Sequence, residues 1–352
     1  MNINTIASTD DVLRAAKVLG PIVSPAPLIR SYALECELAL PAGRRVWIKD
    51  YGWTPVGSFK LLGALYWMSR HAARIGDHPV VAHSSGNFAS GLAFAGKAFG
   101  KRVIIVMPED APQIKFERTR DLGAEVMTYD KSQDHITGQR DRLTLEITER
   151  QQAVQASPYD DNDVIAGNGV GGLEIVHELK AQGRELSHFI CAVSGGGLLA
   201  GHALAIHDGF PAAKIIAVEP SGAADFAQSL ANGQRTRVEH PESICDGLLS
   251  YDVGQHNWPI LQKHVSSAVS VSDAETCQAM RWIDREHGLR TEPSGAISVA
   301  ALQSGQIDLS GSGDIVVVLS GRNVDIEQFA RWVGDLDCNR SRVSSRSSGF
   351  YG

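Results

Sequence analysis

The sequence predicts an α/β protein built mainly from parallel β-sheet. Short β-branched, apolar runs alternate along the chain with longer segments of helical period, which is typical of repeated strand–helix–strand units. Several runs are apolar throughout, such as VIIVM at 103–107 and IVVVL at 315–319. Strands of that composition are expected where helices cover both faces of a sheet.

The expected elements follow from these two patterns. The β-branched runs predict strands at Val46–Lys49, Val80–His83, Val103–Met107, Glu125–Tyr129, Phe189–Val193, Ile215–Val218 and Ile315–Leu319. The segments of helical period predict helices at Ser58–Arg74, Phe88–Phe99, Gln113–Leu122, Ile136–Gln151, Gly172–Ala181, Ala274–His287 and Ile297–Gln303.

The chain of 352 residues is long enough for one large domain or for two lobes. Residues 78–129 hold three expected strands and two intervening helices, a compact unit that could form a small lobe. We therefore expect a large domain from residues 1–74 and 156–336 and a small domain from residues 75–155. Residues 337–352, rich in Ser and Arg, are expected to be a poorly ordered tail.

Charge and cysteine content exclude several classes of protein. The net charge is −7 without blocks of like charge, so neither nucleic acid nor an anionic membrane is an expected partner. The five cysteines form no CxxC pair, which favours reduced thiols over a disulfide framework or a zinc site. The N-terminus lacks a signal-peptide core, and no apolar run approaches the ~20 residues that cross a bilayer. We expect a soluble, cytoplasmic protein.

The glycine cluster SGGG at 194–197 follows an expected strand and opens an apolar helix. A glycine run at such a junction lets backbone N–H groups converge on an anion, and the helix dipole favours negative charge there. The alternative is a tight turn with close helix packing. Because three consecutive glycines exceed what a turn needs, we favour an anion site, with phosphate as its natural occupant.

A second cluster, GNGVGG at 167–172, matches the G-x-G-x-x-G pattern of dinucleotide-binding loops. That fingerprint also needs a solid strand before it and an acidic residue at the end of the next strand. Only VIA precedes the cluster, and the next expected strand is followed by Ser194. We interpret the match as a coincidence.

Three further loops carry candidate functional groups. Lys60 lies in GSFKLLGA and is either a solvated charge or an amine held in a site. The residues HSSGN at 83–87 lead into a helix, where spacing alone favours Ser85 or Asn87 as a helix N-cap over a carboxylate-binding loop. Ser320 follows an expected strand, at the sheet edge where open α/β sheets bind ligands.

In this order, the loops SFK, SSGN, SGGGLLAG and SGRN resemble those of the fold type II, or tryptophan-synthase β-like, pyridoxal-phosphate enzymes. The likeness is greatest to the serine/threonine dehydratases and serine racemase. It covers roughly residues 26–332 and includes the phrases MPEDAPQIKFERTRDLGAEV, AVEPSGAADFAQSL and EPSGAISVAAL. It implies a two-lobed α/β fold in which each lobe is an open, mainly parallel twisted sheet flanked by helices.

The resemblance implies a role for each loop. Lys60 would form the Schiff base with pyridoxal 5′-phosphate and remove the substrate Cα proton, and Phe59 would pack near the cofactor ring. Asn87 would contact the cofactor's 3′ oxygen, and Ser320 its pyridine nitrogen. The phosphate would be held by the backbone amides of Gly195, Gly196, Gly197 and Leu198, with Ser194 at a position that is often glycine in relatives.

The substrate carboxylate would be bound by Ser84, Ser85 and Asn87. Ser85 also matches the hydroxyl that serves racemases as a second base on the opposite face of the cofactor, and both roles stay open. Nearby, Phe88 stands where a histidine usually follows SSGN, and Arg322 replaces the second glycine of SGGN. Arg322 would meet either a second anionic group on the substrate or only a surface carboxylate.

These roles agree with elementary chemistry. Burial disfavours the charged form of a lysine, so its pKa falls and the neutral amine that a Schiff base requires becomes available. A serine at the pyridine nitrogen supplies a neutral hydrogen bond rather than a carboxylate that would keep the ring protonated. The moderate electron sink that results suits β-elimination, which releases a 2-oxo acid and ammonia.

The phrase EPSGAAD resembles a divalent-cation motif of serine racemase and some dehydratases. Carried over, the ligands would be Glu219, the Ala223 carbonyl and Asp225. Oxygen-only ligation suits Mg²⁺ or Ca²⁺ rather than zinc. The alternative is an acidic loop without a metal.

We therefore expect a pyridoxal-phosphate-dependent ammonia-lyase that dehydrates a small β-hydroxy amino acid such as serine or threonine. The family expectation is a homodimer. The alternatives are a racemase with Lys60 and Ser85 as opposite-face bases, or a dehydratase of a bulkier or acidic substrate. A β-replacement enzyme of the cysteine-synthase kind is disfavoured by the loop sequences, and a non-catalytic cofactor-binding protein by the retention of Lys60 and the glycine loop.

Overall fold

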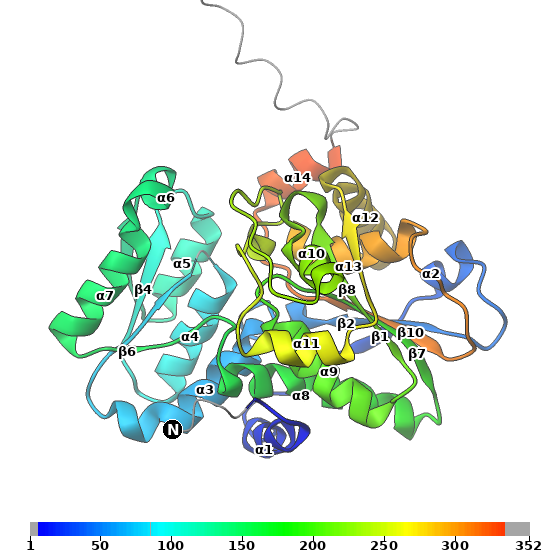
Figure 1. Ribbon diagram of the computed structural model, residues 1–352, viewed down its shortest axis with the longest axis horizontal. Coiled ribbons are helices and arrows are strands. Elements are labelled where there is room, and N and C mark those ends of the chain that lie inside the picture. Colours follow the sequence, from blue (N-terminus) through cyan, green and yellow to red (C-terminus); the bar gives the residue numbers. More distant parts are fainter. Residues whose placement is uncertain (1–5, 85, 335–352) are drawn as a thin grey trace, which may run out of the picture.

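The computed structural model of the chain describes residues 6–84 and 86–334, and its strands form two sheets (Figure 1). The six-stranded sheet has the strand order β1-β2-β10-β7-β8-β9, and the four-stranded sheet has the order β5-β4-β3-β6. The described pairings are parallel apart from β1 with β2, which is antiparallel. The predicted α/β class with mainly parallel sheet is confirmed.

Each predicted strand is present with small shifts at its ends. The strands are β1 (Leu28–Arg30), β2 (Val46–Asp50), β3 (Val80–His83), β4 (Val103–Pro108), β5 (Glu125–Tyr129), β6 (Val154–Gln155), β7 (Leu186–Ala192), β8 (Lys214–Pro220), β9 (Ser267–Val271) and β10 (Asp314–Leu319). The sequence analysis missed β1, β6 and β9, of which the first two have only three and two residues.

The structure has more helices than predicted, and α8 and α13 begin earlier than predicted. They are α1 (Thr9–Leu19), α2 (Tyr32–Glu37), α3 (Lys60–Ile75), α4 (Asn87–Ala98), α5 (Gln113–Asp121), α6 (Asp134–Thr137), α7 (Gln139–Gln151), α8 (Asn162–Ala181), α9 (Gly197–Gly209), α10 (Asp225–Asn232), α11 (Asn257–His264), α12 (Asp273–His287), α13 (Pro293–Gln303) and α14 (Ile326–Gly334). The helix predicted at 136–151 is two helices, because Gly138 adopts a left-handed φ of 57° between them.

The six-stranded sheet is covered on both faces, as its apolar strands require. Along β10, Val316 and Val318 belong to the core shared with α8 and α9, whereas Ile315 and Val317 belong to the core shared with α12 and α13. This alternation is the period-two pattern of a strand buried on both sides. In the four-stranded sheet, Val81 and Val106 pack on the side of α7.

Helix α3 joins the two halves of the molecule, since it contacts both α4 and α8 (Figure 1). Its first residue is Lys60. The lysine predicted to react therefore begins the helix that lies between the two sheets.

The predicted start of α8 at Gly172 is wrong, because the helix begins at Asn162. The Asp161 side chain caps it by accepting from the N–H groups of Asp163 and Val164. The whole GNGVGG cluster consequently lies inside a buried helix. It is no dinucleotide loop, and its glycines serve helix packing: a Cβ on Gly169 would lie 2.8 Å from the Gly201 carbonyl oxygen of α9. In turn, a Cβ on Gly201 would lie 2.3 Å from the Ile165 carbonyl oxygen of α8.

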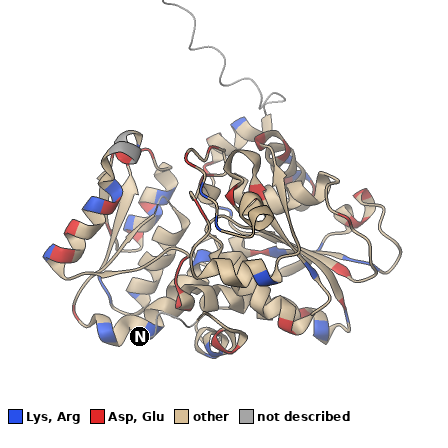
Figure 2. Ribbon diagram, viewed as in Figure 1, with Lys and Arg blue, Asp and Glu red and all other residues tan. Residues whose placement is uncertain are grey.

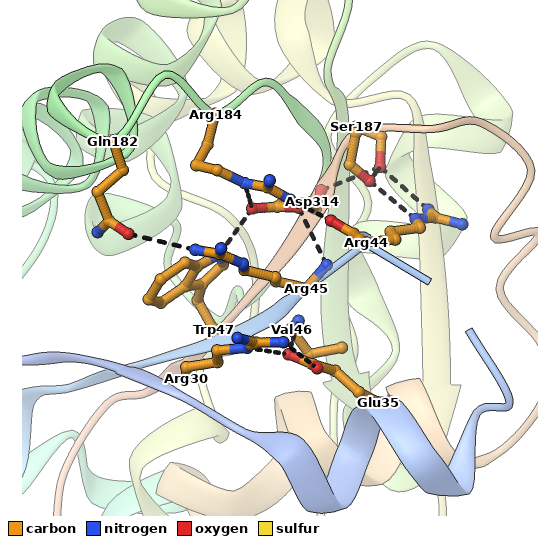
Figure 3. A network of polar contacts seen from close by, with 12 residues as sticks. Arg30, Glu35, Arg44, Arg45, Val46, Trp47, Gln182, Arg184, Ser187 and Asp314 are labelled. Carbon is orange, nitrogen blue, oxygen red and sulfur yellow. Dashed lines mark hydrogen bonds and ion pairs between the residues drawn. The ribbon is translucent and has the colours of Figure 1, made fainter. Parts of the chain in front are cut away.

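A polar network anchors the amino-terminal end of β10 (Figure 3). The buried Asp314 carboxylate accepts from the Trp47 indole at 2.8 Å, from the Arg45 N–H at 3.0 Å and from the Arg184 guanidinium. These donors tie β10 to β2 and to the loop before β7. The opposite, carboxyl-terminal end of β10 leads to Ser320 and faces the candidate site described below.

Basic and acidic residues are interspersed along the ribbon of both halves of the molecule (Figure 2). This mixed distribution agrees with the mild net charge of −7. Within residues 6–84 and 86–334, no helix is long and apolar enough to cross a membrane. No disulfide joins the cysteines of these ranges.

The α8–α9 contact gives a test of the packing. We expect Gly201→Ala to lower the free energy of unfolding by about 1–3 kcal/mol, since the added methyl group would overlap the α8 backbone. Chemical denaturation measures the change. The control is Gly334→Ala, whose Cβ would meet no atom within 4 Å; an equal loss in both variants would contradict the packing account.

Candidate active site

A cavity of about 830 Å³ is lined by residues from both halves of the molecule. The predicted residues Phe59, Lys60, Ser84, Asn87, Gly195, Gly196, Gly197, Leu198 and Ser320 all line it. Segments separated by up to 260 residues in the chain therefore meet at one place. Ser85 was also predicted here but lies outside the described residues, as does the tail at 337–352.

The amine of Lys60 reaches into this cavity. Its Nζ donates to the Pro158 carbonyl oxygen at 2.8 Å and lies 5.1 Å from the centre of the Phe59 ring and 5.8 Å from that of Phe88. Burial lowers the pKa of Lys60 to about 8. A substantial neutral fraction is thus available near neutral pH, as nucleophilic attack by an amine requires.

The glycine loop at 194–197 opens helix α9 at the cavity wall. Gly196 has a φ of 96°, a left-handed conformation that glycine adopts without strain. Ser194 has the same φ, which is strained for a residue with a side chain. A Cβ on Gly195 would lie 2.4 Å from the Tyr159 ring. The start of α9 therefore has no room for a Cβ at 195–197, and glycines at a helix N-terminus are an anion-binding arrangement.

Asn168 links the glycine loop to the helix that carries Lys60. This buried side chain accepts from the Gly63 N–H of α3 at 3.1 Å and donates to the Gly197 carbonyl at 3.2 Å. One amide therefore sets the first turn of α3 against the first turn of α9. Sequence reasoning gave no role to Asn168, because it read the surrounding glycines only as a loop pattern.

The remaining polar residues converge on the same cavity. Ser320 Oγ donates to the Ser294 carbonyl oxygen at 3.1 Å. Ser84 Oγ accepts from the N–H groups of Gly86 and Ala89, both at 3.2 Å, so it caps the start of α4. The N-cap interpretation named Ser85 or Asn87; for Asn87 it is wrong, because Gly86 is the N-cap residue and Asn87 is the first residue of α4. The Ser84 hydroxyl also lines the cavity.

The Asn87 side chain has two hydrogen-bond partners that the sequence analysis did not predict. Its Nδ2 donates to Glu292 Oε1 at 2.7 Å, and its Oδ1 accepts from Asn323 at 2.7 Å. Sequence reasoning missed Glu292. The signal was the phrase EPSGAISVAAL, which carried the resemblance but had no role attached to its glutamate.

Of the two residues that depart from the family pattern, Phe88 lines the cavity and Arg322 does not. Phe88 is buried and lines the cavity near Lys60. Arg322 is not among the lining residues; its Nε lies 3.5 Å from Asp50 Oδ1 and its guanidinium lies over the Trp53 ring. It meets a carboxylate, as one of the two expectations held, but Asp50 is buried rather than on the surface.

Among the described residues, none from the EPSGAAD segment lines the cavity. Glu219 accepts from the N–H groups of Phe226 and Ala227, and Ala223 ends the 3-10 helix η3 (Ser221–Ala223). Both Asp225 carboxylate oxygens are buried without a hydrogen-bond partner. Burial raises the pKa of Glu219 to about 7 and, with Glu219 adding to the effect, that of Asp225 to about 8.

The comparison with known proteins decides the family. The profile described as "Pyridoxal-phosphate dependent enzyme" matches residues 19–321. The chain belongs to this family.

Its relatives within the family include ammonia-lyases and racemases. The chain is 33% identical to an L-threo-3-hydroxyaspartate ammonia-lyase from a Pseudomonas species, over 92% of this chain and 98% of the relative. It is 31% identical to an L-threonine ammonia-lyase from Thermotoga maritima, over 92% of this chain and 77% of the relative. The solved structure of maize serine racemase superposes with a TM-score of 0.85 at 30% identity, covering 93% of this chain and 97% of that one.

The recognised resemblance and its fold class are thereby confirmed: this pyridoxal-phosphate dependent enzyme has the type II fold and belongs with a group of ammonia-lyases and racemases. The site fits the cofactor. It offers a partly neutral lysine amine, backbone N–H groups at a side-chain-free loop, and a serine hydroxyl in one cavity. These are the groups that an aldehyde, a phosphate and a pyridine nitrogen require.

The lowered pKa of Lys60 predicts how apoenzyme captures the cofactor. Only the neutral amine reacts, so the capture rate should rise with pH and level off above about pH 8. Stopped-flow absorbance of the bound cofactor measures the rate. A rate that keeps rising toward the ordinary lysine pKa would contradict a desolvated amine, and Lys60→Ala is the blank.

Proposed function

We propose that this enzyme converts a small β-hydroxy amino acid to a 2-oxo acid and ammonia. The observation that carries the proposal is the position of the Lys60 amine, with its lowered pKa, in the same cavity as the glycine loop, Asn87 and Ser320. When bound, pyridoxal phosphate supplies the electron sink that lets a Cα proton and a Cβ hydroxyl leave.

The chain's own residues have three tasks in this proposal. Lys60 receives the Cα proton, because its neutral amine is the basic group that faces the cavity from α3. Ser84 and the N–H groups at the start of α4 bind the substrate carboxylate, which the helix dipole favours. Ser320 offers a neutral hydroxyl to the ring nitrogen, and the backbone of Gly195, Gly196, Gly197 and Leu198 holds the phosphate.

An acidic β-hydroxy amino acid such as 3-hydroxyaspartate is our first candidate substrate. The Pseudomonas relative is named for that compound. Arg140 also lines the cavity, and the neighbouring Asp141 occupies only its Nε and one Nη at hydrogen-bond distance. It is better placed than Arg322 to meet a second carboxylate. Serine and threonine remain candidates from the threonine ammonia-lyase and serine racemase relatives.

Racemisation of the same substrates is the second candidate function, supported by the likeness to maize serine racemase. In that case Ser85 would be the base opposite Lys60. The two activities are separable, since elimination destroys the amino acid whereas racemisation only inverts it.

The first test is a panel of L- and D-forms of serine, threonine and 3-hydroxyaspartate, assayed for 2-oxo acid and ammonia. We expect release to be fastest with a 3-hydroxyaspartate isomer, and Lys60→Ala to lower kcat/KM by about 10²–10⁴-fold or more. Chiral chromatography of the remaining substrate reports inversion, which Ser85→Ala should abolish if Ser85 is the second base. A wild-type enzyme that releases no 2-oxo acid from any member would contradict the lyase proposal.

We also propose that Mg²⁺ or Ca²⁺ binds at Glu219, the Ala223 carbonyl and Asp225. No cluster of three or more His, Cys, Asp or Glu side chains suited to a metal occurs in the described ranges. The proposed set nevertheless fits a hard cation, because the unpartnered oxygens of Asp225 are buried and oxygen ligands are what these ions prefer. A bound cation would stabilise two buried carboxylates.

The cation proposal predicts a change in thermal stability. Saturating Mg²⁺ or Ca²⁺ should raise Tm by several degrees, on the order of 5 °C, through preferential binding to the folded state. Asp225→Asn should abolish the rise, and differential scanning fluorimetry measures it. The exposed Asp208→Asn is the control. A Tm that changes neither with the two ions nor with a chelator would contradict the proposed cation site.

A homodimer is our proposal for the assembly, and light scattering of the purified enzyme tests it directly.

A further inference from the structure

A buried lysine from one half of the molecule reaches the residues that hold Asn87 in the other half. Lys115 lies on α5, beside the four-stranded sheet, and its side chain is 5% exposed. Its Nζ lies 2.5 Å from Asp246 Oδ2 and 3.5 Å from Glu292 Oε2. Asp246 and Glu292 belong to the half with the six-stranded sheet, so the ion pairs cross between the two.

Glu292 connects this lysine to Asn87. Its side chain is 2% exposed, and its two oxygens face different groups. Oε1 accepts the Asn87 amide at 2.7 Å, whereas Oε2 has no hydrogen-bond partner among the described residues and lies 3.5 Å from the Lys115 ammonium. A buried carboxylate is stable as an anion only when a counter-charge lies close by.

The orientation of the Asn87 amide follows from its partners. Asn323 Nδ2 can only donate, so the Asn87 oxygen must face it; the Glu292 carboxylate must then receive one Asn87 N–H. The second N–H of Asn87 is left for the cavity that Asn87 lines. A protonated Glu292 would accept this N–H less strongly, so the Asn87 amide, held by Asn323 alone, would be positioned less firmly.

We propose that Lys115 is a positioning residue for the cofactor: its ammonium keeps Glu292 anionic, and Glu292 in turn aims the free N–H of Asn87 at the cofactor's 3′ oxygen. This inference rests on the proposed function, which places pyridoxal phosphate beside Asn87. Gly86 is also needed for this arrangement of Lys115 and Glu292. A Cβ there would lie 2.5 Å from Lys115 Cδ, so glycine leaves the passage through which the lysine reaches Glu292.

The electrostatics support the same assignment. Burial raises the pKa of Glu292, the Lys115 ammonium opposes that rise, and Asp246 adds to it. For Lys115, burial acts to lower the pKa, but Glu292 and Asp246 together raise it above the ordinary lysine value. Lys115 on α5 and Asp246 on the 3-10 helix η4 (Asp246–Leu248) are the charged groups that face Glu292, while α4 presents the neutral Asn87.

Replacing the lysine should therefore make cofactor binding depend on pH. In Lys115→Met the pKa of Glu292 rises further, so the fraction of anionic Glu292, and with it the affinity for pyridoxal phosphate, is lost as pH falls through that pKa. We expect about tenfold weaker binding at neutral pH, recovering toward alkaline pH. Lys115→Arg keeps the charge and should restore the wild-type profile.

The measurement is a titration of apoenzyme with pyridoxal phosphate, followed by absorbance across a range of pH. At each pH, the affinity of a variant is divided by the affinity of wild type. This ratio cancels the effect of Lys60 titration, which all the proteins share. The charge-matched control is Lys97→Met, an exposed lysine on the same helix as Asn87. A purely structural role for Lys115 would lower Tm without changing the shape of the pH profile.

The Glu292→Gln variant separates the effect of Lys115 on Glu292 from the effect of Glu292 on Asn87. It cannot titrate, so its affinity ratio should be independent of pH, and adding Lys115→Met to it should cause no further loss. Additive losses, or a flat profile in Lys115→Met, would overturn the inference while leaving the proposed lyase function intact. If wild-type apoenzyme fails to bind pyridoxal phosphate, both are wrong.

Discussion

The close approach of α3, α8 and α9 is the constraint on which the site depends. Lys60 begins α3 and Gly197 begins α9, so the spacing of two helix N-termini sets the distance from the amine to the glycine loop. The glycines of α8 and α9 allow the backbones to touch, and the Asn168 amide joins the two first turns. A substitution at these positions alters the reach of Lys60 without touching any ligand.

Two of the buried acidic side chains, Glu292 and Asp225, have different electrostatic surroundings. Glu292 has a lysine that the fold itself supplies, from across the gap between the sheets. Asp225 has no hydrogen-bond partner at either oxygen, and its neighbour is a second carboxylate. The counter-charge for Glu292 is therefore part of the folded protein itself. For Asp225, the counter-charge would come from solution if the proposed cation binds there.

The sequence predicted the parts of the fold that depend on local pattern. Strands such as β4 and β10 are apolar throughout because both faces are covered, and that composition is visible without a structure. The loop residues were found because an amine, an anion cradle and a hydroxyl follow one another in a recognisable order. Short edge strands such as β1, with three partly buried residues, carry no comparable signal.

Other features depend on contacts between distant segments and could not be read from a pattern. The glycines at 167–172 look like a turn, but their role is set by α9, a separate helix. Arg322 stands beside the active-site serine in sequence, and only the fold turns it toward Asp50. Lys115 and Glu292 are 177 positions apart, so neither residue signals the other until α5 is packed in place.

The strand order has a consequence for how the protein is made. Strand β2, near the start of the chain, pairs directly with β10, near its end, and β10 also pairs with β7. The four-stranded sheet is contiguous in sequence and can form while synthesis continues, whereas the six-stranded sheet stays open at its centre until residues 314–319 leave the ribosome. Capture of the cofactor is therefore a late event, reserved for nearly complete chains.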